Sequence, residues 1–361
     1  MCLAARTSPA AEARDLLAAA VAGGIDWERL WALAHLHEVA PLLAQTLPLA
    51  AGDLVPAEWL ARARRRRHVT LATNARLGEA LIAILGGLAS AGVPAMPVKG
   101  LVVADLLYGS LAARPCADVD ILVQPADLPV ARSVLRELGF VQRVAPGYKA
   151  LVHQFHDPAW GRGAGPAHVR VELHWALWAN SERRLGMAGL WERSVAASLL
   201  GEAIRTLSPE DMLLHLAIHR TRSALRLRWV VDIAELVRRD GAGLDWVSYL
   251  ERARIAGART ASWVVLTLAR DLLDAPVPAS ILGQLAVGWQ KRAILEQTCG
   301  RRALFRPAAR GDLTQQPHLV LRAFEEDGPG RIAGVLAASI ARPVRETLHD
   351  RGLVRARRRM A

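Results

Sequence analysis

The chain has 361 residues, of which 52% are hydrophobic, so it is long enough for about two globular domains and too apolar to be disordered. Its 46 Lys and Arg outnumber its 34 Asp and Glu, which gives a formal net charge of +12. Almost all the basic residues are arginines in an alanine- and leucine-rich chain, so we interpret the charge as general anion affinity and only weakly as a sign of nucleic-acid binding.

The cysteines and the apolar stretches bear on the compartment of the protein. Cys2, Cys116 and Cys299 show no pairing or CxxC spacing, which argues against a disulfide framework and against a thiolate zinc site. The N-terminus carries charge at Glu12, before any apolar stretch, and does not resemble a secretory signal. The long uncharged stretch at 81–98 is broken by glycines and prolines, which favours a buried helix followed by a turn and a strand. We therefore expect a cytoplasmic protein without a membrane partner.

The first segment, 1–92, is predicted to be helical. Asp26 is placed as the N-cap of one helix, and Pro56 precedes another that runs towards Leu88. The arginine-rich run at 62–68 lies within that second helix, and we interpret it as a solvated face.

From about Pro94 the periodicity changes to that of strands. The helix predicted at 125–139 has Gly139 as its C-terminal cap, and the glycine-rich stretch at 159–167 is interpreted as a loop. Short apolar runs predict strands at 95–98, 118–123, 140–144, 151–155 and 168–175. The segment 93–178 is therefore predicted to be a small catalytic domain with a mixed sheet.

The remainder of the chain, 179–361, is predicted to be a C-terminal helical domain. Ser208 is placed as an N-cap, with Pro209 in the first helical position. The last residues, 354–361, form a basic tail that we expect to be frayed. The predicted fold class is α+β, a small mixed sheet flanked by all-α segments.

Two aspartates on the apolar run DVDILV are the first candidates for chemistry. Asp118 and Asp120 alternate with apolar residues, so on a strand they share one face, roughly 7 Å apart. Two ionised carboxylates so placed repel unless a cation lies between them. Oxygen ligands favour Mg²⁺ or Mn²⁺, and phosphate oxygens of a nucleotide commonly complete the coordination of these ions. The pattern therefore predicts a metal-bound triphosphate.

Residues on either side of this run extend the candidate site. Glu172 alternates with apolar residues in HVRVELHW, so it is a third acid that could bridge two metals or take a proton from an attacking hydroxyl. Upstream, Lys99 and Gly100 stand at a strand-to-helix turn where backbone amides and an ammonium can approach phosphate. Arg114 lies between that turn and the aspartates, and the combination is far more specific than any one of its parts.

The chain resembles a bacterial nucleotidyltransferase family of the polymerase-β superfamily. The motifs that carry the resemblance are VKGLVVADLLYGSLAARPCADVDILV, then VELHW and LRWVVDIAEL. The chain is similar, more distantly, to the nucleotidyltransferase toxins of abortive-infection systems. The likeness covers roughly residues 15–280. It implies a small mixed sheet with flanking helices, a divalent metal, and transfer of a nucleoside monophosphate from an NTP.

The resemblance assigns roles to particular residues. Asp118 and Asp120 match the metal-binding pair, and Lys99 with Gly100 matches the phosphate turn. Glu172 stands where the family usually has Asp, so its ligand is one methylene longer.

Two further assignments follow from the same resemblance. Arg114 matches the Arg that precedes the paired aspartates. Ser110, in Gly109-Ser110, is a reserve candidate for the superfamily's Gly-Ser signature, although only seven residues separate it from Asp118.

Some residues keep more than one interpretation. His174 is either a donor to the acids or an interface histidine, and His215 with His219 has zinc-ligand spacing but lacks a third ligand. Asp232 either pairs with a neighbouring arginine in the helical domain or lines the nucleotide cleft.

The leading hypothesis is a Mg²⁺-dependent nucleotidyltransferase whose acceptor is a small molecule, a peptide, a protein or a tRNA. The alternatives are a catalytically silent module that binds RNA or a partner protein, and a DxD glycosyltransferase. The first alternative expects Glu172 turned away from the aspartates. The second expects a Rossmann-like half before them.

Overall fold

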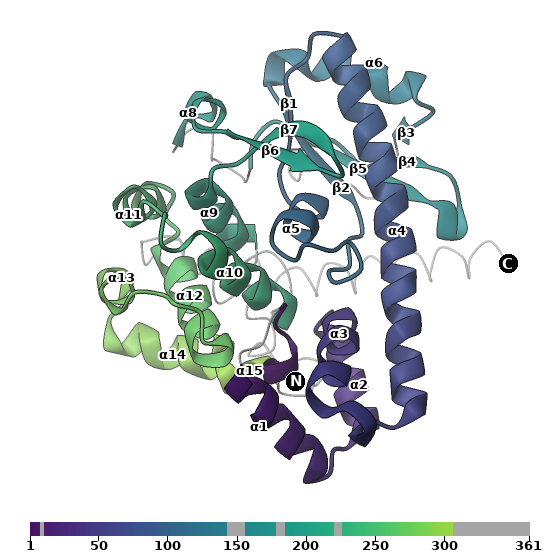
Figure 1. Ribbon diagram of the computed structural model, residues 1–361. Helices are drawn as coiled ribbons and strands as arrows, with labels where there is room; N and C mark the ends of the chain where they lie inside the picture. Colours follow the sequence, from purple (N-terminus) through teal and green to yellow (C-terminus); the bar gives the residue numbers. More distant parts are fainter. Residues whose placement is uncertain (8–10, 143–155, 178–184, 220–225, 306–361) are drawn as a thin grey trace, which may run out of the picture.

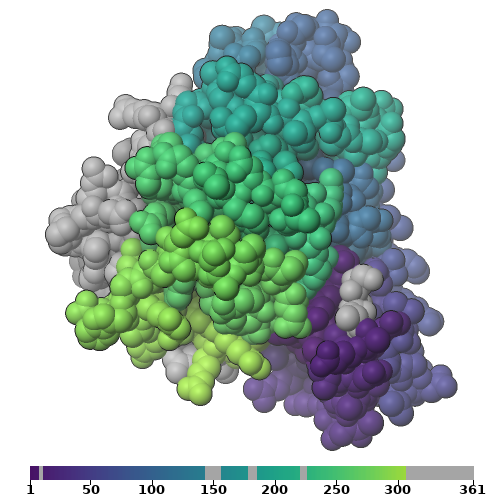
Figure 2. Space-filling model, turned by 60° about the vertical axis from the view of Figure 1, so that its left-hand side comes forward, coloured from purple at the N-terminus to yellow at the C-terminus, as the bar shows by residue number. Residues whose placement is uncertain are grey.

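The computed structural model describes residues 1–7, 11–142, 156–177, 185–219 and 226–305. N-terminal helices, a mixed sheet and C-terminal helices follow one another along the chain (Figure 1), which confirms the predicted α+β class. Buried apolar residues from all three regions form one continuous core, and Figure 2 shows the regions packed together. The strand predicted at 151–155 and the basic tail lie outside the described residues.

The N-terminal region is helical, as predicted. Asp26 caps its helix by accepting a hydrogen bond from the backbone N–H of Arg29 at 2.9 Å. Arg62, Arg64 and Arg65 are exposed, as expected for a solvated face. The helices are α1 (Ala11–Ala22), α2 (Trp27–Leu36), α3 (Ala40–Ala51) and α4 (Ala57–Ser90), with short 3₁₀ turns at Cys2–Ala4 and Gly52–Leu54.

The long helix α4 runs from the N-terminal helices to the sheet (Figure 1). Among the described helices it alone is long and apolar enough to cross a membrane, a test that core helices also pass. Leu81, Ile84 and Leu88 on α4 are buried in the protein's own core. The helix ends at Ser90, and a strand begins at Ala95, as the glycines and prolines of this stretch predict.

The five-stranded sheet is mixed, with the order β1-β2-β5-β4-β3. Strand β2 pairs antiparallel with β1 and parallel with β5. The strands are β1 (Ala95–Pro97), β2 (Val119–Val123), β3 (Val141–Gln142), β4 (Trp160–Arg162) and β5 (Val169–His174). The helices between them are α5 (Leu101–Leu106) and α6 (Leu128–Glu137), with 3₁₀ turns at Pro125–Asp127 and Gly165–Ala167.

Strand β4 corrects one prediction, because it lies in the stretch interpreted as a glycine-rich loop. Trp160 is buried and pairs in register with Val171 of β5. Burial of this large ring explains why a short strand forms there despite the flanking glycines.

A second correction concerns the segment after residue 179, which is not wholly helical. Strands β6 (Val195–Leu199) and β7 (Glu202–Thr206) form an antiparallel hairpin. Leu200 and Gly201 turn the chain with φ of 56° and 87°, the positive values that a two-residue hairpin turn needs. Leucine is uncommon in that conformation, so the turn gave no signal in the sequence.

The remaining C-terminal elements in the described residues are helices. The Ser208 hydroxyl caps α9 by accepting a hydrogen bond from the backbone N–H of Asp211 at 3.2 Å, as predicted. The helices are α8 (Met187–Glu192), α9 (Pro209–His219), α10 (Leu227–Asp240), α11 (Trp246–Ile255), α12 (Arg259–Leu273), α13 (Ala279–Leu285), α14 (Trp289–Cys299) and α15 (Arg301–Leu304).

Candidate active site

Two of the predicted acids face each other across neighbouring strands. Asp120 of β2 is in register with Glu172 of the parallel strand β5. Their side chains therefore share one face of the sheet, as the sequence predicts. Asp118 lies just outside, because β2 begins at Val119 and not at Asp118. All five residues of β2 are buried, so Asp120 is held between two covered faces of the sheet.

Asp120 is the centre of the site. Asp120 is 3% exposed, and its Oδ1 lies 3.1 Å from Lys99 Nζ and 2.9 Å from His174 Nε2. Burial acts to raise the pKa of this carboxyl, but Lys99 and His174 outweigh burial and hold the pKa well below its usual range. The second oxygen, Oδ2, is buried and has no hydrogen-bond partner among the described residues. One carboxylate oxygen is therefore held in place while the other is unsatisfied.

Glu172 is anchored in a similar way. Its Oε1 accepts a 2.5 Å hydrogen bond from Arg170 Nη2, and its Oε2 lies 3.6 Å from His174 Nε2. Burial opposes ionisation, yet the hydrogen bond and charge of His174 and the charge of Lys99 lower the pKa of Glu172 to about 2. Glu172 is thus ionised at neutral pH.

Asp118 behaves differently from the other two acids. Burial and the negative charge of Asp120 raise its pKa from 3.8 to about 6, and Lys99 offsets only part of this rise. Lys99 carries the compensating charge. Burial disfavours its ammonium, but the attraction of Asp120, Asp118 and Glu172 leaves its pKa raised. The acids and the lysine form one electrostatic unit.

Among the described residues, one group has the spacing of a metal site. Asp120, Glu172 and His174 each offer a ligand atom, and these atoms lie within 4.8 Å of one another. His215 and His219, whose ring centroids are 5.8 Å apart, belong to no such group in the described part of the chain.

His156 was not identified from the sequence. Its ring centroid lies 5.1 Å from that of His174, and a β-bridge joins the two residues. Nothing in its spacing distinguishes it, since it precedes β5 in the chain and meets His174 only through the fold.

His219 also interacts electrostatically with the site. Burial and then the charge of Lys99 lower the pKa of His219 well below its usual value, so this imidazole is neutral at physiological pH.

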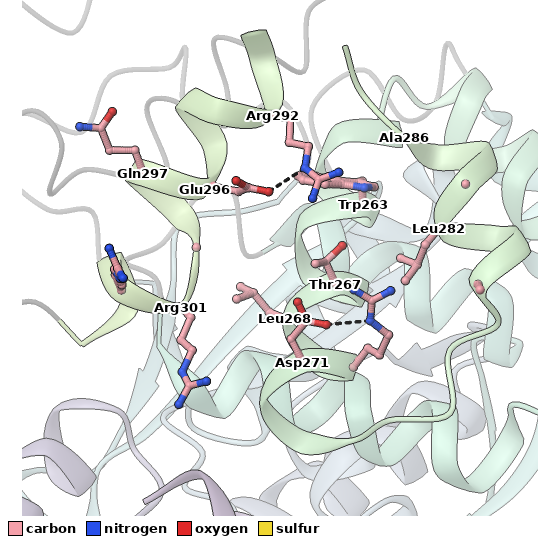
Figure 3. A pocket seen from close by; sticks show the side chains of 15 residues that line it. Trp263, Thr267, Leu268, Asp271, Leu282, Ala286, Arg292, Glu296, Gln297 and Arg301 are labelled. Atoms are coloured by element: carbon pink, nitrogen blue, oxygen red, sulfur yellow. Dashed lines mark hydrogen bonds and ion pairs between the residues drawn. The ribbon is translucent and has the colours of Figure 1, made fainter. Parts of the chain in front are cut away.

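A separate hollow of about 1140 Å³ lies among α12, α13, α14 and α15 (Figure 3). Trp263, Arg292 and Glu296 line it, and Arg292 is paired with Glu296 at 2.7 Å. None of the residues predicted for the site lines this hollow.

Lys99 and Gly100 form the turn between β1 and α5. Gly100 has φ of 58°, and a Cβ atom at this position would lie 3.5 Å from the backbone oxygen of Asp118. The positive φ explains the requirement for glycine. The turn therefore brings the lysine and the start of β2 together.

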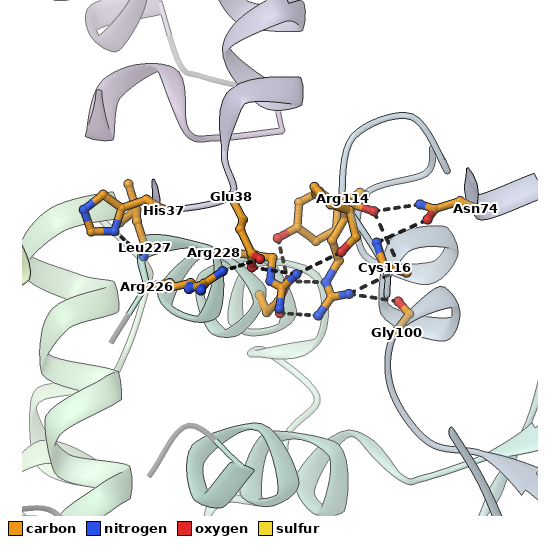
Figure 4. A network of polar contacts seen from close by, with 12 residues as sticks. His37, Glu38, Asn74, Gly100, Arg114, Cys116, Arg226, Leu227 and Arg228 are labelled. Carbon is orange, nitrogen blue, oxygen red and sulfur yellow. Dashed lines mark hydrogen bonds and ion pairs between the residues drawn. The ribbon is translucent and has the colours of Figure 1, made fainter. Parts of the chain in front are cut away.

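Arg114 supports the site without facing its acids. Its Nε and Nη2 donate to the two carboxylate oxygens of Asp232 on α10, each at 2.8 Å, and its Nη1 donates to the Gly100 carbonyl at 3.2 Å (Figure 4). The Tyr108 hydroxyl donates to the same aspartate at 2.6 Å. Asp232 does pair with an arginine, but the partner, Arg114, comes from the segment 93–178 and not from the helical domain as expected.

Asn74 on α4 fixes the same loop from the other side. Its Nδ2 donates to the carbonyls of Leu111 and Arg114, both at 2.7 Å, and its Oδ1 accepts from the backbone N–H of Cys116 at 3.2 Å. Sequence reasoning missed it. Its one signal in the sequence is that Asn74 is the lone amide of α4. The structure shows it fully buried, on a helix whose other buried positions are mostly apolar.

Ser110 lies in the loop after α5. Its hydroxyl accepts from the backbone N–H of Ala112 at 3.2 Å, within the loop itself. The structure thus brings Lys99, Gly100, Asp118, Asp120 and Glu172 together, with Arg114 behind the turn and Ser110 in the connecting loop.

Comparison with known proteins places this chain in a family. It belongs to the family described as uncharacterised nucleotidyltransferase, whose model matches residues 23–274 and so includes every predicted site residue. Among solved structures, an antigenic nucleotidyltransferase-like protein from Paracoccidioides brasiliensis is similar, with 13% identity, coverage of 56% of this chain and 94% of that chain, and a TM-score of 0.34. No curated protein matches the chain significantly.

Proposed function

We propose that this protein transfers a nucleoside monophosphate from an NTP to an acceptor, in a reaction that requires a divalent cation. The observation that carries the proposal is the pairing of Asp120 with Glu172, where a buried carboxylate oxygen, Asp120 Oδ2, has no hydrogen-bond partner in the part of the chain that the structure describes. An unsatisfied buried oxygen costs about 1–3 kcal/mol, and such groups are retained where a ligand completes them.

The residues present fit a divalent cation. Asp118, Asp120 and Glu172 supply the oxygen donors that Mg²⁺ and Mn²⁺ prefer, and burial together with the repulsion of the other acids raises the pKa of Asp118 in the metal-free protein. When bound, the cation supplies charge neutralisation for the phosphates and for the acids that hold it.

The protein's own groups then have defined tasks. The Lys99 ammonium, 3.1 Å from Asp120, is placed to bind phosphate oxygens of the triphosphate. The acceptor oxygen attacks the α-phosphorus, the bond between the α- and β-phosphates breaks, and pyrophosphate leaves. Glu172, with a pKa of about 2, and Asp120, whose pKa lies well below its usual range, are both ionised at neutral pH and so suit ligands better than bases. The acceptor's proton then passes to water.

The structure bears on both alternatives. A silent module would have Glu172 turned away from the aspartates, but its carboxylate lies within the group formed with Asp120. A glycosyltransferase would have a Rossmann-like half before Asp118. The described residues there form helices and one short strand, β1. Both observations favour nucleotidyl transfer.

The partners follow from the proposed reaction. The substrates are an NTP with Mg²⁺ or Mn²⁺, and an acceptor that is a small molecule, peptide, protein or tRNA. We keep the cytoplasm as the proposed location, with no membrane partner.

Calorimetric titration with ATP, CTP, GTP and UTP, with and without Mg²⁺, tests substrate binding. The wild type should bind at least one NTP in a Mg²⁺-dependent manner, and Asp120→Asn should lose that dependence. Asp127→Asn is the matched control. Asp127 is the N-cap residue of α6, but its side chain makes no capping hydrogen bond, and it lies beyond the other end of β2. NTP binding that ignores both Mg²⁺ and Asp120→Asn would contradict the proposal.

Transfer itself is tested with an NTP labelled at the α-phosphate, incubated with cell-extract fractions. Label should pass to an acceptor with the wild type and with Asp127→Asn, but not with Asp120→Asn. An NTP labelled at the γ-phosphate should release its label as pyrophosphate. Label transferred from the γ-position instead would indicate a kinase and overturn nucleotidyl transfer.

A further inference from the structure

One histidine lies between the two carboxylates of the site. His174 follows Glu172 by two residues on β5, so the two side chains share a face of the sheet. Its Nε2 is 2.9 Å from Asp120 Oδ1 and 3.6 Å from Glu172 Oε2. Such an imidazole is positioned as a member of the ligand group and not only as a neighbour.

This position is enclosed by the protein. The residues Asp120, Glu172 and His174 are 3%, 9% and 4% exposed. Asp120 Oδ2 is buried beside the same group, and no described residue forms a hydrogen bond with it. Asp118 is absent from the group of ligand atoms that lie within 4.8 Å of one another. The tightest set of donors is therefore two carboxylates and one imidazole, and not three carboxylates.

The composition of this set bears on which ion it prefers. Magnesium takes oxygen ligands almost exclusively, whereas imidazole nitrogen suits first-row transition ions, and Mn²⁺ accepts both kinds of donor. When such a site binds Mg²⁺, its nitrogen is a poor ligand and only the two carboxylates bind well. The same site offered to Mn²⁺ uses all three.

We infer that Asp120, Glu172 and His174 bind a divalent transition ion, for which Mn²⁺ is the probe, in preference to Mg²⁺. The inference rests on the metal site of the proposed function and specifies its chemistry. His174 Nε2 and the two carboxylates would hold this ion, while Asp118 would be left for a second ion bound with the nucleotide.

Pulsed electron paramagnetic resonance of Mn²⁺ added to the nucleotide-free protein tests the inference. The wild type should show ¹⁴N modulation from a directly bound imidazole, replaced by ¹⁵N modulation when histidine alone is labelled with ¹⁵N. Competition with Mg²⁺ should show tighter binding of Mn²⁺. This measurement uses the wild type, so it does not depend on any variant folding.

Two variants identify the histidine. In His174→Asn the nitrogen modulation should disappear and Mn²⁺ affinity should fall about tenfold or more. His168→Asn is the matched control, because His168 is only partly buried and its Nδ1 lies 3.3 Å from the Gly163 carbonyl, ahead of β5. His168→Asn should behave like the wild type.

The outcomes separate this inference from the proposed function. Mn²⁺ bound without nitrogen modulation, or modulation that survives in His174→Asn, would overturn the inference even if Mg²⁺-dependent nucleotide transfer is observed. Nitrogen-coupled Mn²⁺ in a protein that binds no NTP would support the inference and count against the proposed function.

Discussion

Arg114 and Asp232 are 118 residues apart in the chain and form a buried ion pair through two hydrogen bonds of 2.8 Å. The pair joins the loop before β2 to helix α10, and a third bond from Arg114 to the Gly100 carbonyl ties in the turn that carries Lys99 (Figure 4). The position of the lysine relative to Asp120 thus depends on a helix from the C-terminal half of the protein.

We expect Asp232→Asn to destabilise the protein by roughly 3–5 kcal/mol, because it leaves the Arg114 guanidinium buried without its counter-charge. Urea unfolding measures this loss. The control is Glu251→Gln, which removes the charge from an exposed pair with Arg254 and should leave the midpoint almost unchanged. Equal, small effects in both variants would show that the buried pair does not support the fold.

The raised pKa of Asp118 predicts a pH-dependent penalty in the metal-free protein. Its pKa rises from 3.8 to about 6 on folding, so the folded chain binds this proton more tightly than the unfolded chain does. The stability that Asp118 contributes is therefore present below about pH 4 and lost as pH rises through about 6.

Thermal unfolding of the wild type and of Asp118→Asn across this range checks the sign. The variant should gain in midpoint temperature relative to the wild type as the pH rises. Saturating Mg²⁺ should narrow the gap, since a bound cation favours the charged carboxylate. A gap that shrinks with rising pH in the absence of metal would show that Asp118 is not in the repelled pair.

Lys99→Ala should weaken NTP binding at least about tenfold while leaving Mn²⁺ affinity in the absence of nucleotide unchanged or increased. The reason is that Lys99 competes with a cation for Asp120 in the free protein, at 3.1 Å, but binds triphosphate oxygens in the complex. Calorimetry with each ligand separates the two effects. A fall in Mn²⁺ affinity as large as the fall in NTP affinity would exclude this role.

Much of the fold was predictable because its signals are local. Alternation around Asp120 and Glu172 predicted two strands with acids on a polar face, and the structure pairs those residues in register. The caps at Asp26 and Ser208 were also readable, since each depends on residues within one helical turn. Their chemical roles stay predictions until metal and nucleotide binding are measured.

The features that could not be predicted depend on distant partners. No local pattern indicates that Asp232 meets Arg114, or that His156 meets His174 across a bridge. Strand β4 is too short, and its flanks too rich in glycine, to show a period of two. The hairpin of β6 and β7 packs against β1 through the hydroxyl of Thr206, which donates to the Pro97 carbonyl at 2.9 Å, and such tertiary contacts leave no trace in the sequence.

The central claim is that a divalent cation and an NTP complete the site formed by Asp118, Asp120 and Glu172. It is tested most directly by thermal unfolding with NTP, with and without Mg²⁺, of the wild type and of Asp118→Asn, Asp120→Asn and Glu172→Gln. We predict that Mg²⁺ stabilises the NTP-bound wild type and that each substitution removes this gain, which is measured for every protein against the same protein without Mg²⁺. Loss in the two aspartate variants alone would remove Glu172 from the site. Equal Mg²⁺-dependent stabilisation of all four proteins would contradict the claim.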